Sequence, residues 1–393
     1  MKRLVVIETH PIQYHAPLYR LLQQKHNIAV TAIYGSDFSV AGYYDAEFGA
    51  TFKWDTDLLS GYDARFLATV ARGGGQDVAR VSTRGLSAML RDLQPDAILL
   101  VGYSPRFHQT AFFSSWRYGA PLLFRGETND RALVRRSAKQ FARAQMLRMF
   151  YARFRALLYV GENSRSHFAA LGISASKLFF SPYGVDTTPF CLDESLRLEL
   201  RAATRDALSI AGNRIVILFS GKLSARKAPD VLVQACKQLP ETIRDNLTVL
   251  WLGDGELRAE LERVGQIAPR VDMRFVGFQN QRALSRFYHA SDVLVLPSRA
   301  GETWGLVVNE ALHHGVPCVV SDRVGCAPDL IETGKTGELF CADDSSDLAR
   351  ALRAGFDLMG RAEIRAMCRE RAGQYTLERA AQGIADAFGQ VTR

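Results

Sequence analysis

The sequence predicts an α/β protein with two parallel-sheet domains. Short apolar runs, typical of strands buried on both faces, alternate with helical patterns along most of the chain. Alternating strands and helices form parallel sheets covered by helices on both faces. The chain has 393 residues, which is more than one ordinary core holds, so two domains are expected.

The first half of the chain alternates from its first residues and is interrupted once. Strands are expected over residues 4–7, 28–34, 97–101, 122–124 and 156–160, and helices over 16–24, 86–93, 107–118, 132–151 and 164–171. Residues 35–75, rich in Gly, Tyr, Phe and Asp, break this rhythm. Because so long a connection is uncommon in a compact domain, we interpret it as an insertion with a binding function.

The second half repeats the pattern after a charged helical connector at 193–211. Strands are expected over residues 215–219, 248–252, 273–276, 293–296 and 316–320, and helices over 231–239, 256–264, 282–290 and 304–314. After Asp347 the pattern is helical to the last residues. Ligands of such sheets bind outside the carboxyl ends of the strands, so the loops that follow the strands are the candidate sites.

Composition and charge place the chain among soluble proteins. Hydrophobic residues make up 47% and charged residues 23%, and no apolar run approaches a membrane span. The start, MKRLVVIETHP, has only four successive apolar residues and predicts a strand rather than a signal peptide. Six scattered cysteines without a C-x-x-C pair fit a reducing cytoplasm and no zinc site. A net charge of +8 suits phosphate-bearing substrates or an anionic membrane surface.

Two acids stand out between residues 294 and 322, a stretch that is read as strand, loop, helix and strand. Glu302 is in the loop and Glu310 is inside the helix, beside its apolar stripe. Eight helical residues separate the acids by roughly 12 Å, so they can hold different parts of one elongated ligand. Free N–H groups at the helix N-terminus between them suit a phosphate.

The E-x7-E spacing of these acids, the following NEALHHGVPCVVSD and the later VGCAPDLI resemble the retaining glycosyltransferases of family 4. The resemblance is close over residues 215–338. It implies the GT-B fold, in which two Rossmann-like domains face a central cleft. Residues 1–190 would form the acceptor-binding domain and 191–376 the nucleotide-sugar-binding domain. The last helix, about 377–388, would cross back, so that 377–393 return to the first domain.

The resemblance assigns the two acids to the donor. Glu310 would take the ribose hydroxyls, since a buried carboxylate can accept both. Glu302 would face the hydroxyls of the donor sugar. The intervening loop would give backbone N–H groups to the phosphate, from Thr303, Trp304, Gly305 and Leu306.

The motif GKLSARKAPD, residues 221–230, brings Lys222 and Lys227 to the carboxyl end of a strand. Two cations there can neutralise a departing diphosphate. The family usually has Arg at the first position, and Lys222 keeps the charge without the bidentate fork. Gly221, and Gly253 of the turn GDGE, would line the nucleotide pocket. In VGFQNQ, Phe278 either covers the nucleobase or belongs to the core.

The acceptor side departs from the family pattern. The loop after the first strand, ETHPIQYHAPLY (residues 8–19), contains no Gly. Its His10, Tyr14 and His15 are candidates to meet the acceptor. The alternative for His10 and His15 is that they are ordinary capping or core histidines. Many family members have a His after the strand at 122–124. This chain has RGETND, and Arg125 and Glu127 are the candidates for that role.

No metal ion or other cofactor is expected. Asp55 and Asp57 resemble the metal-binding acid pair of another glycosyltransferase fold, but they lie in the insertion, far from the donor motifs. In the family, the usual proposal for retention is front-face attack in which the leaving phosphate takes the acceptor proton. A paired-carboxylate glycosidase mechanism is therefore not expected.

The leading hypothesis is a nucleotide-sugar-dependent transferase in cell-surface polysaccharide or lipopolysaccharide synthesis, with a glycan or lipid-linked acceptor and no nucleic-acid partner. A sugar-nucleotide epimerase of the same fold and a non-catalytic sugar-nucleotide-binding protein are the alternatives. Residues 131–158 contain eight Lys or Arg and no acid. They would either dock a cytoplasmic protein onto the anionic inner face of the plasma membrane or cover the sheet with a solvated basic face.

Overall fold

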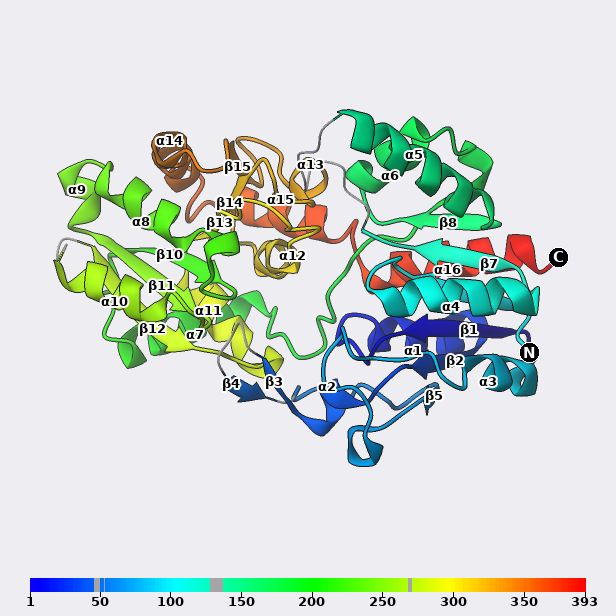
Figure 1. The fold of residues 1–393 in the computed structure, drawn as a ribbon. Helices are drawn as coiled ribbons and strands as arrows, with labels where there is room; N and C mark the ends of the chain where they lie inside the picture. The colour runs from blue at the N-terminus through cyan, green and yellow to red at the C-terminus, as the bar shows by residue number, and fades with distance from the viewer. Residues whose placement is uncertain (46–49, 53, 128–136, 268–270) are drawn as a thin grey trace.

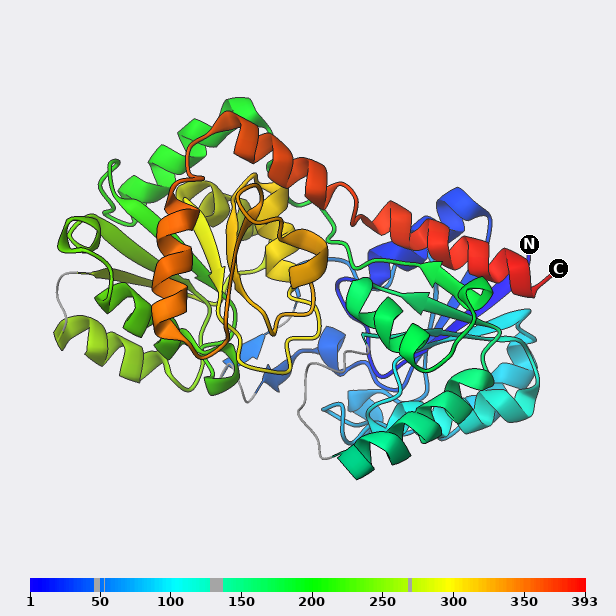
Figure 2. The same ribbon diagram turned by 90° about the horizontal axis from the view of Figure 1, so that it is seen from above.

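Two domains of similar architecture lie side by side in the computed structural model, each with a central sheet covered by helices (Figures 1 and 2). The structure describes residues 1–45, 50–52, 54–127, 137–267 and 271–393. In this part of the chain, no helix is both long enough and apolar enough to cross a membrane.

The sheet of the first domain has seven parallel strands in the order β5-β2-β1-β6-β7-β8-β9. The strands are β1 Arg3–Glu8, β2 Ala29–Tyr34, β5 Asp63–Phe66, β6 Ala97–Val101, β7 Leu122–Arg125, β8 Ala156–Tyr159 and β9 Leu178–Phe180. The helices are α1 Ala16–His26, α2 Phe38–Ala41, α3 Leu86–Leu93, α4 Arg106–Tyr118, α5 Ser137–Ala152 and α6 Glu162–Ala170. A long helix was expected over residues 132–151, and residues 132–136 of it lie outside the described part of the chain.

The sheet of the second domain has six parallel strands in the order β12-β11-β10-β13-β14-β15. They are β10 Ile215–Ser220, β11 Leu247–Leu252, β12 Asp272–Gly277, β13 Val293–Leu296, β14 Cys318–Ser321 and β15 Gly337–Phe340. The helices are α7 Glu194–Ala207, α8 Pro229–Lys237, α9 Glu241–Arg244, α10 Arg258–Ile267, α11 Leu284–Ala290, α12 Leu306–His313, α13 Ala327–Leu330, α14 Ser345–Phe356 and α15 Ala362–Ala372. The last helix, α16 Leu377–Val391, packs on the first domain.

Both sheets reverse their strand order at one point, between β1 and β6 in the first domain and between β10 and β13 in the second. In open α/β sheets, ligands bind at such switch points, outside the carboxyl ends of the strands. The loop after β1 contains residues 9–15, and the loop after β10 contains the GKLSARKAPD motif. The topology therefore places the acceptor candidates and the donor lysines at the two binding edges.

The insertion at 35–75 was expected to be irregular, and this expectation was only partly correct. Its residues Asp63–Phe66 form β5, which pairs in parallel with β2 at the edge of the first sheet. Tyr43–Asp45 (β3) and Ala50–Phe52 (β4) form a separate antiparallel pair. Two short strands paired with each other, and one edge strand paired only with β2, leave little periodic signal in the sequence.

The last helix crosses from the second domain onto the first, as expected (Figure 2). α16 packs against α1, β8 and β9. Gly383 makes this approach possible, because a Cβ atom there would lie 1.8 Å from the carbonyl oxygen of Phe180. The Ser181 hydroxyl donates to the carbonyl of Ala380 at 3.0 Å, which fixes the helix along the end of the sheet.

The two domains also touch at the start of α6. The carboxylate of Asp329, from α13 of the second domain, accepts hydrogen bonds from the backbone N–H of Glu162 at 2.9 and 3.2 Å. The Tyr375 hydroxyl donates to the same carboxylate at 3.1 Å. A Cβ at Gly161 would lie 2.5 Å from the Trp304 ring. Burial raises the pKa of Asp329 to about 6.

Candidate functional site

The floor of the candidate donor site in the second domain contains glycines that let backbone segments touch. Gly221 and Gly253 follow β10 and β11 and have φ angles of 145° and 144°. A Cβ at Gly253 would lie 1.9 Å from the carbonyl oxygen of Gly221. The N–H of Gly221 donates to the carbonyl of Leu252 at 2.9 Å. Only glycine permits this close approach at the carboxyl edge of the sheet.

The Lys227 ammonium contacts the Glu302 carboxylate directly, which joins the two motifs that the sequence singled out. Their side chains are 11% and 12% exposed. The Ser298 hydroxyl donates to the same carboxylate oxygen at 3.1 Å, and the Arg226 guanidinium lies 3.6 Å from it. Lys222 lies in the same turn and is partly buried. The charged groups of Lys227 and Arg226 therefore converge on one carboxylate, that of Glu302.

The helix N-terminus beside this pair belongs to α12, which begins at Leu306, two residues later than expected. Gly305 has a φ of 102° and cannot be part of the helix. A Cβ there would lie 2.9 Å from the Leu296 side chain. The Trp304 side chain is 3% exposed and donates to Asn309 at 2.8 Å, so it faces the core. The backbone carbonyl of Trp304 accepts from the N–H of Cys326 at 2.9 Å, and a contact between its N–H and a phosphate stays a prediction.

Glu310 is buried inside α12 at 2% exposure. The Tyr288 hydroxyl donates to one carboxylate oxygen at 2.6 Å, and the Tyr14 hydroxyl, from the first domain, lies 3.5 Å from the other. Burial raises the pKa of Glu310 to about 7, although hydrogen bonds from Tyr288, Gln281 and Tyr14 oppose this shift. A carboxylate with hydroxyl donors on both oxygens is suited to bind the two hydroxyls of a ribose.

Two further contacts join the domains across the site. The Thr303 hydroxyl donates to the Glu127 carboxylate, which places this acceptor-side candidate directly against the predicted phosphate loop. The rings of Trp54 and Phe278 meet edge to face with centroids 6.4 Å apart. Trp54 lies in the insertion, so the 35–75 segment reaches the loop that is expected to border the nucleobase.

The histidines of the loop after β1 are packed into the first domain. The Nδ1 atom of His15 lies 2.5 Å from the Glu8 carboxylate, to which the Tyr19 hydroxyl also donates at 2.7 Å. Burial alone would raise the pKa of Glu8, but the charge of His15 and these hydrogen bonds hold it below its usual value. His10 packs on Phe38 with centroids 4.4 Å apart, and burial lowers its pKa to about 4.

Arg125 is 2% exposed, and its Nε and Nη2 donors are engaged within the first domain. The guanidinium donates to the carbonyls of Ser181 and Pro182 at 2.9 to 3.3 Å, and it lies over the Tyr183 ring at 4.6 Å. It therefore holds the segment through which the chain leaves the first sheet. Among the candidates from RGETND, Glu127 is the one that meets the other domain, and a part for either in acceptor binding stays a prediction.

Asp57 caps a turn in the insertion. Its carboxylate accepts from the backbone N–H groups of Leu59 and Ser60 at 3.0 and 3.1 Å, and also from the Ser60 hydroxyl. The Ser60 hydroxyl holds the pKa of Asp57 below its usual value. Within the described ranges, no group of three or more His, Cys, Asp or Glu side chains could hold a metal ion.

The comparisons with known proteins agree with this geometry. Residues 201–374 match the model of the family "Glycosyl transferases group 1". The chain is 31% identical over 227 residues to the D-inositol 3-phosphate glycosyltransferase of Geodermatophilus obscurus, covering 55% of this chain and 48% of that protein. It is 36% identical over 141 residues to the sulfoquinovosyl transferase SQD2 of Arabidopsis thaliana, covering 35% and 26%. The chain spans about half the length of the curated relatives it matches first.

Solved structures match both domains together. The crystal structure of Anabaena Alr3699/HepE in complex with UDP has a TM-score of 0.70 at 19% identity, covering 99% of this chain and 100% of that one. The catalytic domain of starch synthase IV from Arabidopsis thaliana, bound to ADP and acarbose, has a TM-score of 0.70 at 14% identity, with coverages of 100% and 99%. At such identities the likeness shows the fold, which is the GT-B arrangement of two Rossmann-like domains.

Sequence reasoning missed four residues that shape the site. Tyr288 and Gln281 bond the buried Glu310, and Ser298 and Arg226 contact Glu302. Arg226 and Ser298 lie within the sequence motifs that contain Lys227 and Glu302. Their closeness in sequence to these two residues could therefore have identified them. Tyr288 lies on α11, and only the packing of α11 against β10, an inner strand of the sheet, brings it to α12. Its position could not be read from the sequence.

We predict that Glu310→Gln raises the melting temperature relative to wild type at about pH 8 but not at about pH 5. The pKa of Glu310 is about 7 in the folded protein and 4.5 in the unfolded reference. In this window the folded state keeps a proton that the unfolded chain loses, so wild-type stability falls as pH rises. The shift is worth up to about 3 kcal/mol, or several degrees for a domain of this size.

Scanning calorimetry across this pH range measures the effect. Glu199→Gln, at an exposed position of α7, is the control and should differ from wild type by the same amount at every pH. A constant difference for Glu310→Gln as well would contradict the raised pKa of Glu310.

Proposed function

We propose that the protein is a retaining glycosyltransferase that moves a sugar from a nucleotide-sugar donor to a glycan or lipid-linked acceptor in cell-surface polysaccharide or lipopolysaccharide synthesis. One observation carries the proposal. The Lys227–Glu302 pair lies beside the N-terminus of α12 and Glu310 is buried within that helix, all inside the segment that matches glycosyl transferases group 1.

Each part of this arrangement has a task in the transfer. Lys227, with Lys222 in the same turn, would meet the diphosphate as its charge grows during departure. Backbone N–H groups from Thr303 to Leu306 would hold the phosphate, since helix N-termini favour anions. Glu310 would bind the ribose hydroxyls and Glu302 the sugar. The acceptor hydroxyl would attack the same face that the diphosphate leaves, and the leaving phosphate oxygen would take its proton.

UDP-sugars are the first donors to test. Anabaena Alr3699/HepE, which shares the fold over nearly the whole chain, was crystallised with UDP and with UDP-glucose. A role in surface polysaccharides is supported by a fold likeness to WaaG, a glycosyltransferase involved in lipopolysaccharide biosynthesis, with a TM-score of 0.64 at 14% identity. On the acceptor side, Glu127 is the best-placed candidate because its carboxylate reaches Thr303.

Incubation with donor alone separates this proposal from its alternatives. A transferase hydrolyses the donor slowly without acceptor, an epimerase of the same fold returns a changed sugar nucleotide, and a binding protein returns the donor intact. The panel should contain UDP-glucose, UDP-galactose, UDP-N-acetylglucosamine, GDP-mannose and ADP-glucose, with the products resolved by chromatography.

We predict that Lys227→Ala and Glu302→Gln each lower turnover about 100-fold or more. Removal of one charged group from a leaving-group site typically lowers the rate by this factor, because a contact that stabilises the transition state is lost. The measurement is steady-state release of nucleoside diphosphate from the best donor. Lys237→Ala, an exposed lysine at the end of α8, is the matched control and should turn over normally. Wild-type rates in both site variants would refute the assignment.

We also propose that turnover needs no metal ion, because the lysines and the α12 N-terminus supply positive charge to the diphosphate. Turnover is therefore predicted to be the same in excess EDTA as in added magnesium or manganese. A loss in EDTA that either metal restores would contradict this and would direct attention to Asp55 and Asp57.

The outer face of α4 and α5 supports peripheral contact with a membrane. Among the described residues, the large apolar side chains that are at least 47% exposed on these two helices are Phe113, Trp116, Phe141, Met146 and Met149. The helices are neighbours, since the rings of Phe112 and Phe150 lie 4.8 Å apart. Exposed Arg148, Arg153 and Arg155 flank this face. Arg131, Arg135 and Arg136 lie outside the described residues.

The inner side of α5 and of the residues that follow it packs on the sheet. This agrees with the alternative interpretation of residues 131–158, in which they cover the sheet. Leu147, Tyr151 and Phe154 are at most 1% exposed and belong to the core. Since the buried side is accounted for, the exposed apolar residues of the outer face are surplus to the fold. An apolar face with flanking arginines is the pattern by which proteins lie on anionic lipid surfaces.

We predict that the protein co-sediments with phosphatidylglycerol-containing liposomes at low salt and less at high salt, because salt screens the attraction. Phe141→Glu combined with Met149→Glu should abolish co-sedimentation without changing donor hydrolysis. Leu198→Glu, at a 62% exposed position of α7, is the control for adding charge to an exposed apolar site. If wild type ignores the liposomes at low salt, the membrane proposal fails.

A further inference from the structure

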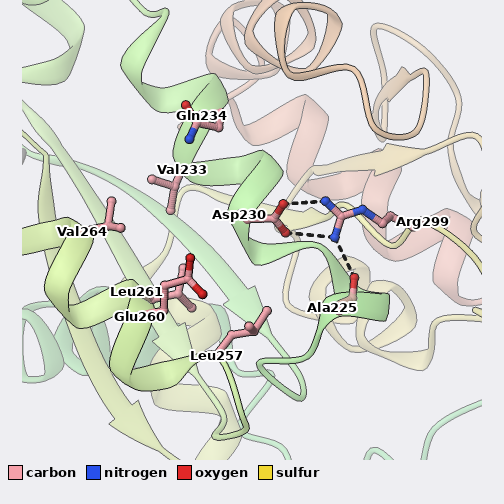
Figure 3. Close-up of a pocket in the computed structure, with 9 residues that line it drawn as sticks. All are labelled: Ala225, Asp230, Val233, Gln234, Leu257, Glu260, Leu261, Val264 and Arg299. Carbon is pink, nitrogen blue, oxygen red and sulfur yellow. Dashed lines mark hydrogen bonds and ion pairs between the residues drawn. The ribbon is translucent and has the colours of Figure 1, made fainter.

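Arg299 forms side-chain hydrogen bonds with several residues that are distant in the sequence. It follows β13 in the loop that carries Glu302, and its side chain is 31% exposed. The guanidinium donates to the carbonyl of Ala225 at 2.7 Å and to both carboxylate oxygens of Asp230 (Figure 3). It also donates to the carboxylate of Asp343. The backbone N–H of Arg299 donates to the carbonyl of Arg226 at 3.0 Å.

These contacts bracket the turn that carries Lys227. Ala225 and Arg226 precede the lysine, and Asp230 lies three residues after it, at the start of α8. Arg299 thus binds this turn on both sides of Lys227. The turn is tied to the 297–303 loop through Arg299 and through the Lys227–Glu302 pair. A further link is Arg226, whose guanidinium donates to the carbonyl of Gly301 at 3.4 Å. Figure 3 shows the Asp230 carboxylate and the Ala225 carbonyl meeting the same guanidinium from different directions.

The position of the Lys227 ammonium depends on this turn. A lysine side chain has a flexible four-carbon stem and a compact charge, so the backbone determines where the charge can reach. The residue after Lys227, Ala228, has a φ of 53°, an uncommon conformation for a residue with a Cβ, which needs support from its surroundings. Paired N–H groups of a planar guanidinium fix direction as well as distance, which an ammonium cannot do.

We propose that Arg299 is a positioning residue of the transfer reaction, which holds the Lys227 turn so that the ammonium meets the departing diphosphate. This inference rests on the proposed function. Arg299 touches no substrate and acts only through Lys227. Its loss misplaces a group that works in the transition state, and a displacement of about 1 Å at such a site costs up to about 100-fold in rate.

The test is a double-mutant cycle on donor hydrolysis, with the best donor of the panel as probe. Arg299→Ala should lower kcat about tenfold or more and change KM less than about threefold, since ribose binding by Glu310 stays intact. In the Lys227→Ala background, Arg299→Ala should cost less than about threefold more, because the group that it positions is gone. Arg299→Lys keeps the positive charge but lacks the paired N–H groups of the guanidinium. Its kcat should therefore be almost as low as that of Arg299→Ala.

The matched control is Arg274→Ala. Arg274 also bonds a carboxylate and a carbonyl, those of Asp272 at 3.0 Å and Ser209 at 3.4 Å, but at the amino end of β12. This variant should keep the wild-type kcat. Melting temperatures of all variants are measured first, and if Arg299→Ala is unfolded at the assay temperature, Arg299→Lys carries the cycle in its place.

The outcomes separate the two proposals. The positioning role is overturned if Arg299→Ala or Arg299→Lys keeps the wild-type kcat, or if Arg299 and Lys227 substitutions lower kcat by independent factors that multiply. In these cases wild type still turns over donor, and the proposed function stands. If wild type acts on no nucleotide sugar of the panel, the proposed function fails, and the inference on Arg299 fails with it.

Discussion

The ion pair between Lys227 and Glu302 is the contact on which the candidate donor site depends. It joins the loop after β10 to the loop after β13, two strands that are neighbours at the switch point of the second sheet. Both side chains are mostly buried, and removing charges from water is costly unless they are paired and further hydrogen-bonded. Ser298 and Arg226 supply these additional contacts to Glu302. Loss of one partner of such a buried pair typically costs about 3–5 kcal/mol.

Around this pair, the second domain is built for close approach of backbones. A Cβ atom at Gly253 would clash with the backbone of Gly221, and a Cβ atom at Gly305 would crowd the side chain of Leu296. These contacts bring the loops that follow β10, β11 and β13 to one edge of the sheet. A diphosphate bound there would face main-chain N–H groups and cations in surroundings with little water, where electrostatic interactions are stronger than in solution.

The first domain contributes contacts across the cleft rather than a second copy of this site. Tyr14 reaches Glu310, and Glu127 reaches Thr303. In contrast, the buried Glu8 and His15 form an internal pair of the first domain, and the His15 ring is stacked with the ring of Tyr183. The loop after β1 lacks glycine. Its aromatic and imidazole side chains pack together, whereas in the second domain glycines let the backbones of neighbouring loops approach closely. This part of the first domain is thus ordered mainly by side chains.

The sequence by itself determined the two parallel sheets, the order of most elements and the location of the donor motifs. This was possible because buried parallel strands are continuous apolar runs and because the loop after such a strand must lie at the binding edge. Local patterns, supported by the E-x7-E resemblance, were therefore enough to identify Glu302, Glu310 and Lys227 as candidates. The left-handed Gly305, which delays the start of α12 to Leu306, was not read from those patterns.

Only the tertiary structure decided which side chains meet across long sequence separations. Arg125 was a candidate for the acceptor, and the structure shows its guanidinium bound to the segment at Ser181. Trp54, in an insertion with little periodicity, lies against Phe278 more than 200 residues later. Arg299 spans the Lys227 turn through Asp230, and nothing in the local sequence separates it from an ordinary surface arginine. Helix and strand periods report which face of an element is buried, but not which distant residue covers it. That choice is made by the packing of whole elements.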